Sequence, residues 1–481
     1  MNIMPSNRDA ETTPRSKKLA EGVAAAIARD IMEMGWPVGR TVGSMQELLA
    51  RHGVSHAVLR EAVRQIEQNG LAVMRRGAGG GLVVARQPGD VAAQTTATYL
   101  QLIDVDVREL IDARFLFQNA MLRAVVARVT ASDAAGLREL ARAMNGGDLP
   151  EPELIRRYNR LITRLAEIAD NPLLTVLNKL VFRALAPAVA REDPQRIHNT
   201  LEPGGGAVLV KHWEALIEAI IADDATSAVE LLRTSRPGEQ ARLIQRAEDR
   251  RRLAQAGAAP LIASEILEAV DEGRGRKHSQ LVALSVARNI AANGWRPGHH
   301  LGLEPALLAE YGVSRNIFRE AARILEVHGV CSSKRGQRGG FIVGSPRPDY
   351  AVETAVSSLR FLGVEPRHVG EVRLTVQPNL AAAAAAADDR GRAMLDASLA
   401  GDPAGAANRF LSALGRVGAN RVTGLVSAVL IGLEATEGPQ PTASDAGMIL
   451  ARAAQAAIQD GDAALTRRIV MDLCRVDHPS L

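Results

Sequence analysis

A stretch of fifty residues occurs twice in this chain of 481 residues. Residues 35–84 and 294–343 align without a gap at a constant offset of 259 positions, and 21 of the 50 aligned residues are identical. Chance pairing gives only a handful of identities, so the sequence indicates an internal duplication. The offset is far longer than the roughly 20–50 residues of solenoid repeats. The chain is therefore expected to contain one module twice.

Each copy has the pattern of three helices followed by a β-hairpin. A helix ending at a glycine (18–35 and 279–294) precedes a short helix (45–53 and 304–312). The third helix lies in "VSHAVLREAVRQIEQNG" of the first copy and "VSRNIFREAARILEVHG" of the second, and short β-type runs around a Gly/Arg tip follow it. Its apolar residues, at helical spacing, should face a core. They are Leu59, Ala62, Val63 and Ile66, and Phe318, Ala321, Ala322 and Leu325.

The opposite face of the third helix carries a row of cations. In the first copy they are His56, Arg60 and Arg64, at i, i+4 and i+8, and the second copy has arginine at all three positions. Such a row suits the major groove of DNA, where the N-terminal end of a helix meets base edges and the rest reaches phosphates. Ser55 and Ser314 are predicted helix N-caps, and the basic hairpin tip is expected to touch phosphate or the minor groove. The predicted DNA-binding residues are Ser44, Gln46, Ser55, His56, Arg60, Arg64, Arg75, Arg76, Gly77, Ser314, Arg315, Asn316, Arg319, Arg323, Lys334, Arg335 and Arg338.

The order "L-L-A-x-x-G-V-S-x-x-x-x-R-E-A-x-R-x-x-E-x-x-G", followed by a basic hairpin, resembles the winged helix-turn-helix of the GntR family. The resemblance covers Lys17–Gln87 and Gly275–Pro346. A single helix of this kind would more often be a surface helix with a solvated charged face. Its recurrence with turn, cap and wing in order favours DNA binding. The run "GAGGG" leads into a strand and not into a helix, which excludes a phosphate-binding loop.

The residues after each copy have helical patterns that resemble the FCD effector-binding domain of the FadR-like GntR subgroup. The likeness rests on "DAR" at Asp112–Arg114, "NPLL" at Asn171 and "KHW" at His212, and it is weaker in the second half. Many members of that subgroup bind a metal through an Asp-x3-His pair and two more histidines. Here the pair falls on Tyr158 and Ile162, and in the second half on two apolar residues, so no metal is predicted.

Two arginines of these helical regions could recognise a carboxylate effector. They are Arg114 and Arg373, and His212 completes the candidate effector-binding residues. Pairing of each arginine with a helix carboxylate, such as Asp112 or Glu371, is an equally supported alternative. In that case the helical domains serve mainly as dimerising scaffolds.

Composition agrees with a mainly α fold. Aromatic residues make up 3% of the chain, which fits Ala/Leu/Val/Ile helical cores better than β-sandwiches. Cys331 and Cys474 have no disulfide or metal spacing, and no signal peptide or membrane span is evident, which together predict a cytoplasmic protein. The expected domains are a disordered tail (1–14), winged helix-turn-helix 1 (15–87), helical domain 1 (88–236), a helical linker (237–273), winged helix-turn-helix 2 (274–346) and a degenerate helical domain 2 (347–481).

These features predict a sequence-specific transcriptional regulator without a cofactor or catalytic residues. Its partner would be a double-stranded, palindrome-like DNA operator, read either by one chain acting as a pseudo-dimer or by a homodimer. The first copy has His56 at the position where the second copy has Arg315. Because arginine commonly reads guanine with two hydrogen bonds and histidine cannot, this difference predicts an imperfect palindrome in which the second copy holds guanine more firmly. One alternative is a pyridoxal-phosphate aminotransferase-like regulator, which the absence of lysine after Lys334 disfavours. The other is a non-specific DNA-bridging protein, against which the modest net charge of +4 argues.

Overall fold

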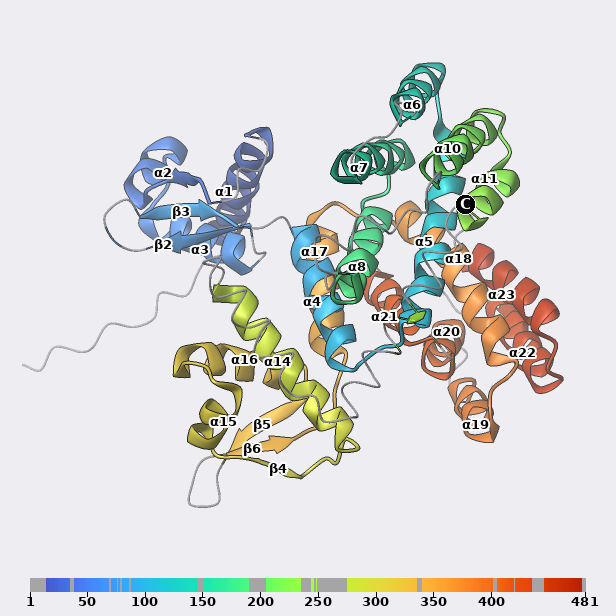
Figure 1. The fold of residues 1–481 in the computed structure, drawn as a ribbon. Coiled ribbons are helices and arrows are strands. Elements are labelled where there is room, and N and C mark those ends of the chain that lie inside the picture. The colour runs from blue at the N-terminus through green and yellow to red at the C-terminus, as the bar shows by residue number, and fades with distance from the viewer. Residues whose placement is uncertain are drawn as a thin grey trace, which may run out of the picture. The chain divides into compact units, whose positions relative to one another are not determined.

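Over the residues that it describes, the computed structural model is mainly helical, with two small antiparallel sheets, as the sequence predicts (Figure 1). It describes residues 14–34, 39–68, 71–75, 77, 80–85, 88–144, 151–189, 205–234, 244–245, 248, 275–334, 340–400, 405–418, 420–434 and 445–477. The predicted tail, apart from its last residue, and nearly all of the predicted linker lie outside these residues. The chain divides into two compact units, residues 1–91 with 357–362, and residues 92–356 with 363–481. Each unit is described separately.

The first winged module (residues 14–85) forms most of the first unit. Its elements are α1 (Pro14–Glu33), β1 (Thr41–Gly43), α2 (Met45–His52), α3 (His56–Gln68), β2 (Ala72–Arg75) and β3 (Gly81–Val84). The predicted apolar stripe of α3 is buried, with Leu59, Ala62 and Ile66 at 0% exposure. It packs in one core with Ile27 and Ile31 of α1. Because α3 buries one face, its cationic face is left toward solvent.

The wing contains one strand more than the sequence suggests. The strand order is β1-β3-β2, all antiparallel, so β1 closes the predicted hairpin into a three-stranded sheet. Gly81 has φ 154°, and a Cβ there would lie 2.7 Å from the carbonyl oxygen of Gly43 on β1. The third strand therefore needs glycine at position 81, since any side chain would push β1 and β3 apart.

The second winged module (residues 275–344) has the same order of elements. They are α14 (Gly275–Ala292), β4 (His300–Gly302), α15 (Glu304–Tyr311), α16 (Arg315–Val327), β5 (Cys331–Lys334) and β6 (Gly340–Val343). The strand order β4-β6-β5 matches that of the first module. Phe318 of α16 and Phe341 of β6 stack edge to face with centroids 5.2 Å apart, which ties the third helix to the sheet.

One glutamate fixes the wing to the third helix in each module. The amide of Met74 on β2 donates to Glu67 Oε1 at 2.7 Å, and the amide of Ser333 on β5 donates to Glu326 Oε1 at 2.9 Å. This is the glutamate of the "R-x-x-E-x-x-G" motif. It holds the hairpin in a constant position relative to the cationic face.

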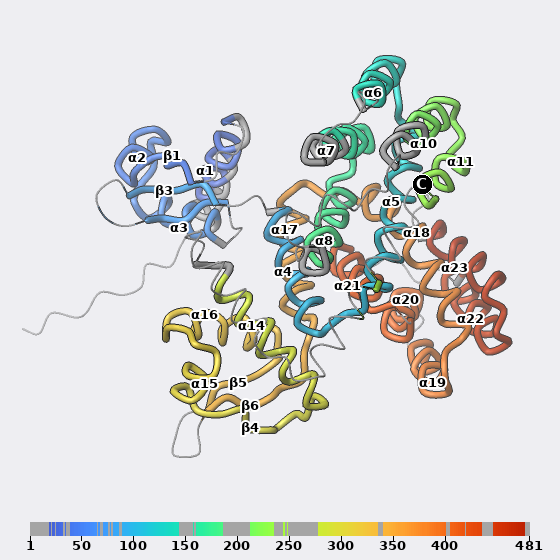
Figure 2. Tube along the Cα trace, viewed as in Figure 1, coloured from blue at the N-terminus to red at the C-terminus, as the bar shows by residue number. Residues whose placement is uncertain are grey.

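The remaining helices of the second unit are described in two groups by chain order, called the first and second helical domains, and a linking helix precedes each group (Figure 2). The first linking helix is α4 (Pro88–Leu102), and the first helical domain contains α5 (Val107–Arg128), α6 (Ala131–Met144), α7 (Glu151–Ala169), α8 (Pro172–Val189), α10 (Gly205–Ile221) and α11 (Ala225–Thr234). The second linking helix is α17 (Asp349–Phe361), and the second helical domain contains α18 (Pro366–Ala384), α19 (Asp389–Ser398), α20 (Ala406–Val417), α21 (Arg421–Glu434), α22 (Asp445–Gln459) and α23 (Ala463–Asp477). No described helix is long and apolar enough to span a membrane.

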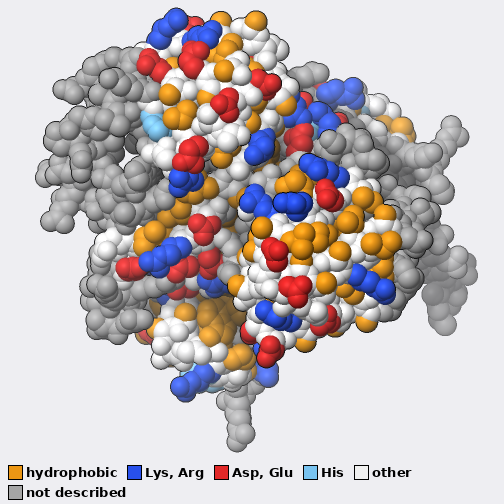
Figure 3. All heavy atoms as spheres, turned by 90° about the vertical axis from the view of Figure 1, so that its right-hand side faces the viewer, with side chains coloured by type: hydrophobic (Ala, Val, Ile, Leu, Met, Phe, Trp, Pro, Cys, Tyr) orange, Lys and Arg blue, Asp and Glu red, His pale blue; other side chains and the backbone are white. Residues whose placement is uncertain are grey.

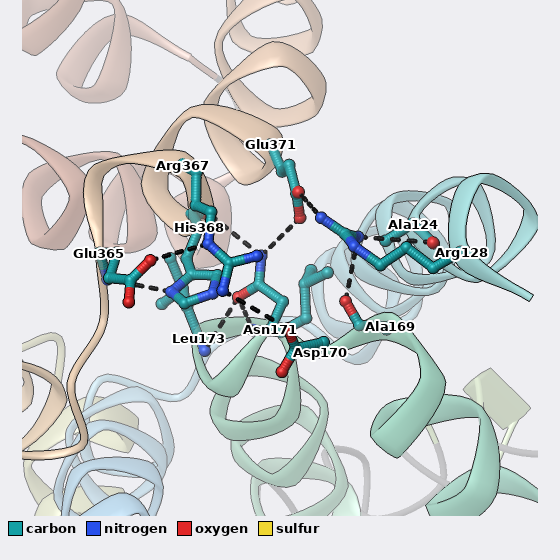
Figure 4. Close-up of polar contacts among 11 residues, drawn as sticks. Ala124, Arg128, Ala169, Asp170, Asn171, Leu173, Glu365, Arg367, His368 and Glu371 are labelled. Atoms are coloured by element: carbon teal, nitrogen blue, oxygen red, sulfur yellow. Dashed lines mark hydrogen bonds and ion pairs between the residues drawn. The ribbon is translucent and has the colours of Figure 1, made fainter. Parts of the chain in front are cut away.

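The two helical domains contact each other through α5, α8, α18 and α21. Asn171 begins α8: its Oδ1 accepts the amides of Leu173 and Leu174, while its Nδ2 donates to the carbonyl oxygen of His368 on α18 at 3.1 Å (Figure 4). The same side chain donates to Glu371, which also pairs with Arg128 of α5. The amide side chain of Asn171 therefore caps its own helix and binds the opposite domain at once.

A second contact of the same kind runs in the opposite direction. Asn420 begins α21, its Oδ1 accepts two amides of the first turn, and its Nδ2 donates to the carbonyl oxygen of Glu109 on α5 at 2.9 Å. Glu109 and His368 are 259 positions apart, which is the offset of the sequence repeat. Here Arg421 adds an ion pair to Glu109 at 2.6 Å. Each domain therefore presents a capping asparagine to the start of the other domain's long helix.

The linking helices also contribute to the cores of the winged modules. Leu102 at the end of α4 is buried in the core of the second winged module, and Gln280 of α14 donates to Thr98 of α4 at 3.1 Å. Phe361 at the end of α17 packs against the core of the first winged module. Leu102 and Phe361 are again 259 positions apart.

Candidate nucleic-acid interface

Capping and turns set the third helix of each module. Ser44 caps α2 through a reciprocal capping box with Glu47, and Gly53 ends α2 in the left-handed conformation with φ 61°. Ser55 then accepts the amide of Val58 at 3.4 Å. In the second module Ser314 is the N-cap of α16 and accepts the amide of Ile317 at 3.4 Å. The predicted caps are thus in place.

The predicted cationic row of the first module lies on the exposed face of α3. His56, Arg60 and Arg64 are all exposed. Arg64 donates to Glu61 at 2.9 Å, and this hydrogen bond raises the pKa of its guanidinium. Arg64 is therefore partly neutralised within its own helix, whereas His56 and Arg60 at the N-terminal end are available to a ligand.

The corresponding row of the second module makes a different set of contacts. Arg315, Arg319 and Arg323 are exposed on α16. The Nε atoms of Arg315 and Arg319 lie 3.2 and 3.3 Å from the same oxygen, Oε1 of Glu304 at the start of α15. The position equivalent to Glu304 in the first module is Met45, which carries no charge. Sequence reasoning missed Glu304, although its place at the first position of the predicted short helix (304–312) was a usable signal.

The other predicted DNA-binding residues surround these helices. Gln46 and Asn316 are exposed on the first turns of α2 and α16, and Ser44 is partly exposed. On the wings, Arg75, Gly77 and Lys334 are exposed. Arg76, Arg335 and Arg338, at the tips, lie outside the described residues. In each module, therefore, the cations of the third helix and the described basic residue of the wing are exposed.

One face of the helical domains can be compared with the winged modules for its distribution of charge. In Figure 3 acidic and basic side chains are interspersed over the visible face and are not gathered by sign. DNA binding depends on basic charge gathered on one surface. The winged modules are therefore the better candidates for the nucleic-acid interface.

Arg373 lies in a buried ion pair. Its side chain is 2% exposed, its Nη1 lies 2.7 Å from Glu434 Oε1 at the end of α21, and its Nη2 donates to Asn408 Oδ1 at 3.1 Å. The predicted alternative partner, Glu371, instead binds Arg128 and Asn171. The expectation of a helix carboxylate partner is thus met by a different carboxylate, because α18 turns Glu371 toward the other domain and Arg373 toward α21.

The two other candidate effector residues also have structural contacts. Arg114 is partly buried on α5 and interacts with other groups. The pKa of its neighbour Asp112 is raised by burial and by the charge of Glu109. His212 bonds through Nε2 to the carbonyl oxygen of Leu231, which links α10 to α11. No group of three potential metal-ligating side chains occurs among the described residues.

An open pocket of about 350 Å³, referred to below as the cavity, lies between α19 and α22 of the second helical domain. Its lining includes Asp396, Arg452, Gln455 and Gln459. Asp396 accepts the side-chain amides of both glutamines, at 2.7 and 3.2 Å. Neither Arg114 nor Arg373 lines this cavity, so the sequence-predicted effector residues and the cavity are separate features.

Comparison with known proteins identifies the two kinds of domain in the first half. Residues 19–81 match the model of the bacterial regulatory proteins of the gntR family, and residues 109–235 match the model of the FCD domain. The chain therefore contains a GntR-family helix-turn-helix domain and an FCD domain, which are the domains of DNA-binding transcriptional regulators. These matches agree with the resemblance seen in the sequence.

Individual proteins with known names share less than 30% sequence identity with this chain in the comparisons that follow. A Mycobacterium gastri protein named as an HTH-type transcriptional regulator, RmpR, is 28% identical over 189 residues, which cover 38% of this chain and 67% of the relative. The solved structure of Streptococcus agalactiae GntR is 17% identical and covers 48% of this chain and 99% of its own, with a TM-score of 0.27. E. coli McbR/YncC is 16% identical and covers 47% and 97%, with a TM-score of 0.25. Scores this low add nothing to the fold description given above.

Proposed function

We propose that this chain is a transcriptional regulator in which one polypeptide carries both DNA readers of a pseudo-dimer. The first and second winged modules would each read one half of a palindrome-like operator. The two helical domains would take the place of the dimerisation interface that separate subunits form in an ordinary twofold-symmetric regulator.

The reciprocal asparagine contacts carry this proposal. In a twofold-symmetric dimer a residue i of one subunit contacts residue j of the other, and j contacts i in return. Asn171 to His368 and Asn420 to Glu109 have this reciprocal form. The two acceptors are related by the sequence offset of 259, and the two asparagines, 249 positions apart, each cap the first turn of a helix. The exchange of Leu102 and Phe361 between the module cores supports the same relation. An internal duplication explains both patterns with one event.

The two readers would not be equivalent. His56 stands where the second module has Arg315, and of these two side chains only arginine can donate two parallel hydrogen bonds to guanine O6 and N7. We therefore infer an operator whose half-sites differ, with guanine held more firmly by the second module.

The proposal includes a small-molecule effector, whose identity it leaves open. FCD domains bind small-molecule effectors. The contacts of Arg373 and His212 favour a structural role for both residues. A carboxylate effector would then depend on Arg114 in the first helical domain, which matches the FCD model.

Selection of binding sites from random duplex DNA, followed by mobility-shift titration, tests the proposal. The expected result is one selected operator with two related but unequal half-sites. Arg60→Ala and Arg319→Ala should each weaken binding by about 1–3 kcal/mol if the arginine touches a base, and should relax selection only in its own half-site. Arg138→Ala is a matched control, because Arg138 is a partly exposed arginine of α6 that pairs with Glu218 in the first helical domain.

Three outcomes would contradict the proposal. Uniform binding to all duplexes would indicate a non-specific bridging protein. A strictly symmetric operator would remove the distinction between the readers. Equal affinities for Arg319→Ala and Arg138→Ala would show that α16 is not a recognition helix.

A further inference from the structure

Glu304 is the feature that most clearly separates the two candidate recognition surfaces. Its carboxylate oxygen Oε1 lies 3.2 Å from Nε of Arg315 and 3.3 Å from Nε of Arg319. The two arginine side chains are 61% and 64% exposed, whereas Glu304 is 28% exposed. One carboxylate thus pairs with two solvent-exposed cations at the N-terminal end of α16, and it accepts a hydrogen bond from Arg319.

The atoms used in these contacts matter for recognition. Both arginines approach Glu304 through Nε, so the contact leaves the terminal Nη nitrogens of each guanidinium for another acceptor. A guanidinium can offer several different pairs of N–H donors to a base edge. Discrimination between bases improves when one pair is already oriented before the DNA binds. A long exposed side chain also loses rotamer freedom when it binds, and a contact already made in the free protein reduces that loss.

The first winged module lacks this device. Met45 occupies the position of Glu304, and His56 occupies that of Arg315. A thioether is a weak hydrogen-bond acceptor without charge, so it cannot fix a guanidinium. Arg60, the equivalent of Arg319, therefore has no carboxylate at this position to orient it.

We propose that Glu304 is a specificity-determining positioning residue, which orients Arg315 and Arg319 so that the second winged module discriminates between bases more sharply than the first. The inference rests on the proposed DNA-binding function and deepens it. Glu304 itself acts through the arginines. Its negative charge opposes the DNA phosphates, so it lowers affinity for all duplexes while it raises selectivity.

The test exchanges the residues at this position in the full-length chain. Glu304→Met gives the second module the residue of the first, and Met45→Glu makes the reverse change. Glu310→Met is the matched control, since Glu310 is an exposed glutamate of the same helix that contacts Asn289 of α14. Each variant is titrated against the operator selected by the wild-type chain and against operators with one base pair changed in either half-site, at several salt concentrations.

Glu304→Met is expected to reduce discrimination against changed base pairs by about tenfold, in the second half-site only. It should also bind non-specific duplexes more tightly than the wild type does. Glu304→Gln, which keeps a hydrogen-bond acceptor of the same length, should lose less discrimination than Glu304→Met. Met45→Glu should leave the second half-site unchanged and sharpen selection at the base pair nearest Arg60.

Two results would overturn the inference. If Glu304→Met and Glu310→Met change the affinity for every duplex by the same factor, Glu304 is only a local negative charge. If Glu304→Met binds with unchanged discrimination, the arginines need no orientation. With either result, the proposed function still holds if the wild-type chain selects a specific operator. If the wild-type chain selects no operator, both the proposed function and the role of Glu304 are overturned.

Discussion

Replacement of Arg373 tests whether the second helical domain uses this arginine for stability or for an effector. Arg373 is 2% exposed and bonds Glu434 at 2.7 Å and Asn408 at 3.1 Å. We choose Arg373→Met, because methionine retains much of the side-chain volume and removes the charge. The replacement removes this ion pair from the Glu434 carboxylate, which is 18% exposed.

The magnitude follows from this burial. Breaking a fully buried pair by removing one partner costs about 3–5 kcal/mol. Water can reach Glu434 in part, so we take the lower end and expect a loss of about 3 kcal/mol from the free energy of unfolding of this domain. The double variant Arg373→Met/Glu434→Gln removes both charges of the pair and should regain about half of the loss, since the Glu434 charge no longer lacks the Arg373 guanidinium.

Hydrogen exchange measured by mass spectrometry is the appropriate assay. The chain has several domains, so one global unfolding transition is not expected. The three tryptophans, at positions 36, 213 and 295, all lie outside the second helical domain, and fluorescence would not report on it. A loss of 3 kcal/mol corresponds to about a hundredfold faster exchange in peptides from α18 and α21, with peptides from α14 unchanged.

A small effect would refute this reasoning. If Arg373→Met accelerates exchange less than about fivefold, the ion pair is not a stabilising contact. If added carboxylates slow hydrogen exchange in the wild-type domain but not in this variant, Arg373 is an effector-binding residue and the structural assignment is wrong.

Three further predictions follow from named contacts. Asn420→Asp keeps the helix cap but loses the donor to the Glu109 carbonyl and adds a negative charge beside Glu109, so it should lower the stability of the helical domains by about 1–3 kcal/mol, measured by thermal unfolding against Asn420→Ser. Burial lowers the pKa of His328 to about 4, below its unfolded value of about 6.5. The second winged module should therefore be fully stable above pH 6.5 and should lose up to about 3 kcal/mol of its free energy of unfolding as the pH falls toward 4. A His328→Gln variant that shows the same pH dependence would contradict this prediction. Gly340→Ala places a Cβ 2.6 Å from the Gly302 carbonyl oxygen at φ 131°, and should destabilise the second sheet by more than about 1 kcal/mol in denaturant titration, an effect that is absent if β4 moves freely.

The winged modules could be predicted from the sequence in unusual detail. The apolar stripe of the third helix, the N-cap serines and the hairpin are local features with strong periodic or turn signals, and all are present in the structure. The third strand was missed because Thr41–Gly43 and His300–Gly302 contain only three residues each. Such strands form because β3 and β6 offer a free edge and not because of their own pattern.

Side-chain partners were predicted less well than helices. Arg373 and Glu371 are two residues apart on one helix and point to different neighbours, a distinction that depends on the packing of α18 between α5 and α21. The role of Glu304 depends in the same way on the approach of α15 to α16. Sequence periodicity gives the buried face of a helix, but it does not give the helix that will cover that face.

The number of chains on one operator tests the central claim most directly. Solution mass is measured for the 51.2 kDa chain alone, for the selected duplex alone and for their complex near saturation. The account predicts one chain per duplex at high affinity, with both half-sites protected from cleavage by the single chain. A complex of two chains per operator, with each chain protecting only one half-site, would contradict it.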